Sequence, residues 1–242
     1  MNKLLAALLL SPLAAGAAFA ASVLIVSALS NLKITFPLLA GAAAYCALHF
    51  YPFGLATSFG PKARLQRARR WQGCFYVLAH ELSHALAALL SGVRVKKIAV
   101  KKTGGFVMMN ATSPFISLAP YFIPFYALAA GLLYGLTSFF LDMTPYRPFF
   151  TALAGFFLAF HLLNTLDILA GPAQSDLKKA GGVFFSFALV TLLNSLCLVL
   201  ILKFIFPGLI SLKAYAARAW ADTATLLRWA LAAMSYFFRA LS

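Results

Sequence analysis

Two histidines and the only glutamate of the chain stand together in the segment His80-Glu81-Leu82-Ser83-His84. Residues four apart lie on one face of an α-helix, so His80 and His84 can present two imidazole nitrogens to one metal ion. Glu81 would then stand beside the ion as a base for a metal-bound water. The spacing therefore predicts a zinc site with its own proton acceptor.

This segment lies within a stretch that is apolar enough to cross a membrane. The other acidic residues are Asp142, Asp167, Asp176 and Asp222. An ionisable group at mid-bilayer depth costs about 2.5 to 3.5 kcal/mol on insertion scales, so such groups usually face a cavity or each other and serve a function. The alternative is a pair of neutral packing histidines beside a protonated Glu81. In so acid-poor a chain, we favour the metal site.

The composition places the chain among membrane proteins. Of its 242 residues, 63% are hydrophobic and only 10% are charged. The formal net charge is +15, but the basic residues concentrate between apolar segments, as in membrane-flanking loops, and we therefore expect no nucleic-acid partner. Cys46, Cys74 and Cys197 lack the paired spacing of a cysteine zinc site and are expected to be packing residues.

The apolar segments predict an all-α polytopic membrane protein with about six transmembrane helices and a short β-hairpin after the motif helix. The predicted spans are residues 4–29, 34–59, 71–92, 113–141, 149–170 and 183–206. The tail, residues 209–242, spreads basic and aromatic side chains along a helix. This tail is expected to lie in the membrane interface.

Residues 93–109 differ in pattern from the apolar segments, because valine and isoleucine are interleaved with lysine and arginine. Gly104-Gly105 follows, and then the apolar run from Phe106 to Met109. The pattern predicts two short strands around a Gly-Gly turn. Sheet backbone at membrane depth must be shielded by protein or line a wet cavity, so we expect the hairpin at the surface or against the metal site.

The sequence leaves two questions open: whether the N-terminal segment is cleaved, and which way the motif helix crosses the membrane. Lys3, a Leu/Ala-rich stretch and Ala18-Phe19-Ala20 have the pattern of a cleavable signal peptide, whereas hydrophobicity continuing to Leu29 favours an uncleaved span. Five Lys or Arg lie in residues 62–70 and five in residues 94–102, on either side of the motif helix. The charge asymmetry therefore does not choose a membrane orientation.

A catalytic zinc site takes three protein ligands, and no second histidine pair exists. The candidates for the third are Asp167, Asp176, His161 and His49, and a carboxylate fits well beside two imidazoles. His161 shares one helix face with Asn164. The side chains on that face either hydrogen-bond to the metal ligands and hold them in place, or hydrogen-bond to a neighbouring helix.

The whole arrangement resembles the site-2 protease family of intramembrane zinc metalloproteases, especially its small bacterial members. The resemblance spans about residues 71–206: the motif helix, a Gly-containing β-loop, a following segment with early prolines, and then Asn164 and the stretch from Gly171 to Gly182. It implies that His80 and His84 bind zinc, that Glu81 is the general base, and that Asp176 is the third ligand.

Three departures from the family pattern bear on the third ligand. Ser83 replaces a common glycine, Leu177 follows Asp176 where the family has glycine, and Asn164 lies farther from Asp176 than usual. Asp167 therefore stays a rival. We favour Asp176, because a helix break at Gly171-Pro172 would let its carboxylate turn inward.

The resemblance implies a multi-pass protein of the bacterial inner membrane that uses Zn²⁺ to cut membrane-spanning protein substrates within or next to the bilayer. Gly104, Gly105 and Phe106 are expected to receive an unwound substrate segment as an added strand. The expected domains are N-terminal membrane helices (1–60), a metalloprotease core (61–207) and a C-terminal interfacial helix (208–242).

Two other functions remain as alternatives. A metal-ion or proton transporter could use the same three motif residues, but it would need more polar residues along several spans than this chain has. A metal-binding membrane scaffold without proteolysis is the second alternative, and the intact Glu81 argues against it. The oligomeric state and the pathway are not indicated by the sequence.

Overall fold

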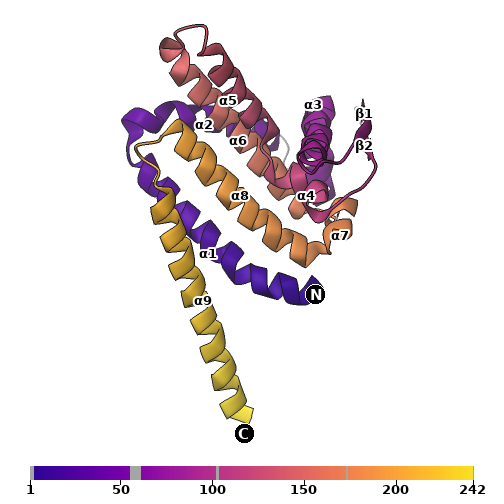
Figure 1. The fold of residues 1–242 in the computed structure, drawn as a ribbon, viewed down its shortest axis with the longest axis vertical. Helices are drawn as coiled ribbons and strands as arrows, with labels where there is room; N and C mark the ends of the chain where they lie inside the picture. Colours follow the sequence, from indigo (N-terminus) through magenta and orange to yellow (C-terminus); the bar gives the residue numbers. More distant parts are fainter. Residues whose placement is uncertain (1–2, 55–60, 102–103, 173, 242) are drawn as a thin grey trace. The chain divides into compact units, whose positions relative to one another are not determined.

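A computed structural model describes residues 3–54, 61–101, 104–172 and 174–241, and Figure 1 shows their fold. The elements follow one another as α1 (Lys3–Leu29), α2 (Leu32–Gly54), α3 (Pro61–Leu90), β1 (Val95–Lys101), β2 (Gly104–Met109), α4 (Pro114–Phe122), α5 (Phe125–Thr137), the 3-10 turn η1 (Thr144–Tyr146), α6 (Arg147–Leu169), α7 (Ser175–Ala180), α8 (Val183–Ile205) and α9 (Leu212–Leu241). The predicted all-α polytopic fold with a short hairpin is confirmed.

The membrane spans differ in detail from six simple helices. Among the described residues, four segments are long and apolar enough to cross a membrane: Lys3–Leu29, Leu32–Phe50, Thr144–Leu169 and Val183–Ile205. The predicted span 113–141 is broken, because α4 and α5 meet at 76°. Pro124 stands at this break, where it has no N–H to continue the helix. Among the described side chains of the motif helix, the apolar segment is Phe75–Leu90.

The chain divides into two compact units, residues 32–180 and residues 1–31 together with 181–242. In the second of these, α1 packs against α8 and α9. Gly16 lies so close to Thr223 that a Cβ on Gly16 would overlap the threonine side chain. The predicted interfacial position of the tail and the predicted three-domain division stay predictions.

The motif belongs to the unit of residues 32–180, in which α2 and α6 have the most extensive contact. Two glycines allow their backbones to touch: Gly41 meets the Ala152 carbonyl, and Gly155 meets the Leu38 carbonyl. A side chain at either glycine would overlap the opposite backbone. This is the close packing that small residues permit between membrane helices.

The hairpin has a different turn from the one predicted. Lys101 pairs with Gly104 and Val100 pairs with Gly105, so both glycines are part of β2. The connection at residues 102–103 lies outside the described residues. The predicted Gly-Gly turn is therefore wrong, because both glycines lie within β2. Gly104 has a φ of +155°, which other residues rarely adopt.

Two short helices bring further residues towards α3. The Ser113 hydroxyl caps α4 by accepting a hydrogen bond of 3.2 Å from the Ile116 N–H, and Pro114 occupies the first turn. From Ile116 to Phe122, α4 is buried. It packs against both α3 and α7, the short helix that follows the Gly171-Pro172 break.

The glycine contacts between α2 and α6 generate a stability prediction. Gly155→Ala should lower the free energy of unfolding by about 1 to 3 kcal/mol, because the added methyl group overpacks the Leu38 backbone. Gly135→Ala in α5 is the matched control, since a Cβ there meets nothing within 4 Å. Unfolding of both variants would be followed in the same detergent. Equal stability of the two would contradict the close contact.

Candidate metal centre

Three side chains converge beside α3. The Nε2 atom of His80 lies 3.6 Å from Asp176 Oδ2, and the Nε2 atom of His84 lies 3.7 Å from the same oxygen. The two imidazole rings stand at 82° with their centroids 4.9 Å apart, and the three ligand atoms lie within 4.8 Å of one another. Ligand atoms around one tetrahedral zinc ion are about 3.3 Å apart. The donor set and its spacing therefore fit one zinc ion after small side-chain movements.

The local sequence explains this convergence. His80 and His84 are one helical turn apart on α3. Asp176 reaches them because α6 ends before Gly171-Pro172 and the chain turns into α7. Leu177, which is only 2% exposed, anchors α7 in the core next to Asp176. The residue that departs from the family pattern thus holds the aspartate helix in place.

Each of the three side chains has an outer partner. The Nδ1–H of His84 donates to the Ile116 carbonyl at 2.8 Å, which leaves Nε2 free for a metal. The Tyr76 hydroxyl lies 3.4 Å from Nδ1 of His80. The Tyr121 hydroxyl donates to Asp176 Oδ2 at 3.4 Å.

Sequence reasoning missed these outer partners. Tyr76 could have been found, because it precedes His80 by four residues on the same helix face. Tyr121 gave no local signal, since it lies 55 residues from Asp176 along the chain. The Ile116 carbonyl is a backbone atom, and no residue type marks it.

A proline explains why the Ile116 carbonyl is available to His84. Within an α-helix this carbonyl would accept from the N–H of the residue four positions later. That residue is Pro120, which has no N–H. The buried oxygen therefore needs another donor, and His84 Nδ1 supplies it. The proline inside α4 thus helps to orient a histidine on α3.

Asp176 is ionised at neutral pH. Burial raises the pKa of its carboxyl group, but the nearby imidazoles of His80 and His84 outweigh this effect and hold the pKa below its usual range. A negative charge between two imidazoles is what a cation site requires. The electrostatics of Asp176 thus agree with the donor geometry.

Glu81 is 6% exposed and lies against the hairpin. A Cβ on Gly105 would fall 2.6 Å from Glu81 Cγ and 2.8 Å from Glu81 Oε1. Only glycine lets the β2 backbone approach the glutamate so closely. The structure thus places Gly105 against Glu81 itself, while Phe106 is 46% exposed on the same strand.

The other candidate residues lie away from the three converging side chains. Asp167 Oδ2 is 3.3 Å from His49 Nε2, so these two candidates face each other across α2 and α6. The Asn164 amide donates to the Tyr45 hydroxyl at 2.8 Å, which also joins α6 to α2. Both contacts join α2 to α6. For Asn164, this is the hydrogen bond to a neighbouring helix that the sequence offered as one of two roles.

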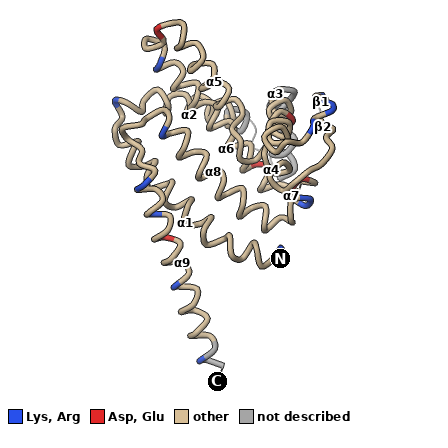
Figure 2. Tube along the Cα trace, in the orientation of Figure 1, with Lys and Arg blue, Asp and Glu red and all other residues tan. Residues whose placement is uncertain are grey.

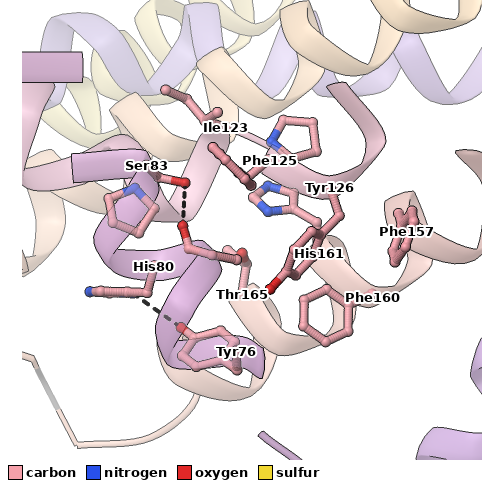
Figure 3. A pocket seen from close by; sticks show the side chains of 13 residues that line it. Tyr76, His80, Ser83, Ile123, Phe125, Tyr126, Phe157, Phe160, His161 and Thr165 are labelled. Carbon is pink, nitrogen blue, oxygen red and sulfur yellow. Dashed lines mark hydrogen bonds between the residues drawn. The ribbon is translucent and has the colours of Figure 1, made fainter. Parts of the chain in front are cut away.

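His161 lines a cavity of about 20 Å³ beside the metal centre, as Figure 3 shows. The cavity also contacts His80, Ser83 and Thr165, and aromatic side chains of α5 and α6 form much of its wall. A cavity of this size holds about one water molecule. His161 therefore shares a largely aromatic cavity with His80, and Asp176 does not line it.

The comparisons with known proteins agree with the motif. A family model described as Peptidase M50B-like matches residues 64–165, or 102 of the 242 residues. This match supports membership of the site-2 protease family. Searches of curated proteins and of solved structures gave no match.

The matched segment contains most of the motif helix, the hairpin, α4, α5 and most of α6. It ends before both Asp167 and Asp176. The family match therefore supports a metallopeptidase at the level of the family, and the choice of third ligand depends on geometry alone.

The role of Pro120 can be tested on zinc affinity. Pro120→Ala supplies an N–H that competes with His84 for the Ile116 carbonyl, so zinc should bind about 10- to 100-fold more weakly. The readout is the zinc dissociation constant of purified protein in competition with a chelator. Pro148→Ala is the control, because Pro148 lies in the first turn of α6, where an added N–H has no helical acceptor.

A backbone ester at the same position separates the N–H from the shape of the proline ring. The α-hydroxy analogue of alanine at position 120 also lacks an N–H, and it should keep the zinc affinity of the unaltered protein. If the alanine and ester variants bind zinc equally, the N–H is not what matters at this position.

Proposed function

We propose that this protein is an intramembrane zinc endopeptidase that cuts membrane protein substrates within or next to the bilayer. The observation that carries the proposal is the convergence of His80, His84 and Asp176 beside the buried Glu81 in a multi-pass membrane protein. Placing several ionisable groups inside an apolar protein costs free energy, so such groups usually serve a function. The family match supports the same assignment.

In this proposal His80, His84 and Asp176 hold the zinc ion. Bound there, zinc would polarise the scissile carbonyl and lower the pKa of its water towards 7. Glu81 accepts the proton of the attacking water and passes it to the leaving amine. The outer partners Tyr76, Ile116 and Tyr121 keep the three ligands in place.

The hairpin provides a route for an unwound substrate. A transmembrane helix satisfies its backbone hydrogen bonds internally, so its peptide bonds must be released before cleavage. A segment released in this way can pair with a free strand edge. Gly104, Gly105 and Phe106 lie in β2, which touches Glu81 through Gly105 and pairs with β1. A segment added at the outer edge of β1 would thus extend the sheet that lies against Glu81. We place the enzyme in the inner membrane of a bacterial cell.

Glu81→Gln tests the chemistry. Cleavage should fall by at least about two orders of magnitude, since the amide cannot accept the proton, while zinc stays bound. The assay is co-expression with tagged single-span membrane proteins, combined with metal analysis of the purified variant. Asp142→Asn makes the same chemical change at an exposed position between α5 and α6 and should leave cleavage intact.

This comparison also separates the rival functions. A transporter would lose metal or proton flux in the Glu81→Gln variant without any effect on substrate length. An inactive scaffold would show no cleavage in either form. Cleavage that persists at full rate in Glu81→Gln would remove Glu81 from the mechanism.

The third ligand is tested by a pair of matched substitutions. Asp176→Asn removes the negative charge that faces both histidines, so the purified protein should lose most of its zinc and its proteolysis. Asp167→Asn should leave the zinc content near one per chain, because its contact is with His49. Metal analysis of both variants decides, and zinc loss in Asp167→Asn alone would reverse the assignment.

A further inference from the structure

The hairpin has one face against α3 and another turned away from it. Val100 pairs with Gly105, and Gly105 faces Glu81 of α3. Side chains alternate between the two faces of a strand, so Lys97 and Lys101 lie on the outward face. Both lysines are exposed.

Two apolar side chains share this outward face. Phe106 is opposite Ala99, and Met108 is opposite Lys97. Their side chains are 46% and 50% exposed. The outward face therefore combines two cations with uncovered apolar surface, and Figure 2 shows the basic residues of the hairpin.

The positive charge of the hairpin is not neutralised within the described part of the chain. No described acidic side chain forms an ion pair with Lys97 or Lys101. Lys178 and Lys179, which are exposed on α7 just after Asp176, add to the positive charge of this unit. Lysines on two elements would therefore attract an acidic partner: the hairpin, which contacts Glu81, and α7, which carries Asp176.

The outer edge of β1 has no strand partner among the described residues. Such an edge offers unpaired backbone groups to an incoming extended segment. Residues opposite Lys97 and Lys101 on an added strand would be four positions apart and on one face. Acidic side chains at those two positions would form cross-strand pairs with the lysines, and such pairs are favourable.

We propose that the hairpin selects substrate segments with two acidic residues four positions apart and an apolar residue midway between them. The midway residue would lie opposite Ala99, on the face that carries Phe106. This inference rests on the proposed proteolysis, because it names the substrate class of that site. Anionic lipid headgroups would also be attracted to the lysines, but they would not distinguish one spacing of acidic residues from another.

The probes are synthetic peptides with an apolar helix joined to one of four five-residue segments. Glu-Ser-Leu-Ser-Glu has the proposed spacing, and Gln-Ser-Leu-Ser-Gln and Lys-Ser-Leu-Ser-Lys change its charge. Ser-Glu-Leu-Glu-Ser keeps the composition but places the acids two positions apart. Binding to the full-length Glu81→Gln protein is measured in zwitterionic detergent, and cleavage is measured with the unaltered protein.

The first peptide should bind about fivefold more tightly than the glutamine peptide and more tightly than the one with altered spacing. High salt should reduce the difference. Lys97→Glu combined with Lys101→Glu should turn the preference towards the lysine peptide. Lys33→Glu combined with Lys213→Glu, at exposed positions in α2 and α9, is the matched control and should change nothing.

Equal binding of all four peptides, or of none, would overturn the inference. So would a preference that survives the charge reversal, or a charge reversal that weakens the binding of all four peptides equally. Selective binding without cleavage by the unaltered protein would refute the proposed proteolysis and leave the recognition rule standing. Cleavage without discrimination would do the reverse.

Discussion

The hydrogen bond from His84 to the Ile116 carbonyl is the interaction on which the geometry of the candidate metal centre depends. It fixes α4 to α3, and α4 in turn reaches α7 through Tyr121 and Asp176. One short buried helix thus sets the distance between the two histidines and the aspartate. Pro120 makes this arrangement available by leaving a helical carbonyl without its usual donor.

The few polar contacts in this unit matter for the packing of its helices, because most of the surrounding side chains are apolar. In unit 32–180 the carboxylate of Asp176 faces two imidazoles, and Asp167 faces His49. Asn164 bonds to Tyr45 in the same helix pair that the glycines bring together. Polar groups at membrane depth are costly when left alone, so these two clusters select one way of packing the helices. The first cluster forms the candidate metal centre, and the second joins α2 to α6.

Much of this centre could be predicted from the sequence, because the information was local. His80, Glu81 and His84 follow from helical spacing, and the hairpin follows from alternating side chains. The choice between Asp167 and Asp176 could not be derived in this way, since it depends on the direction that the chain takes after Gly171-Pro172. The turn of the hairpin was misplaced for a related reason. The glycines are needed by a contact with Glu81 that is distant in sequence.

The contact of Gly105 with Glu81 also restricts how the hairpin can vary in length. Neighbouring positions of a strand point to opposite faces, so sliding β2 by one residue along α3 would turn a different position towards the glutamate. One such slip would bring Phe106 to the place that has no room for a single methyl group. Gly105 therefore fixes the register of β2 against α3. An insertion or deletion within β2 would therefore break this contact unless a glycine again faced Glu81.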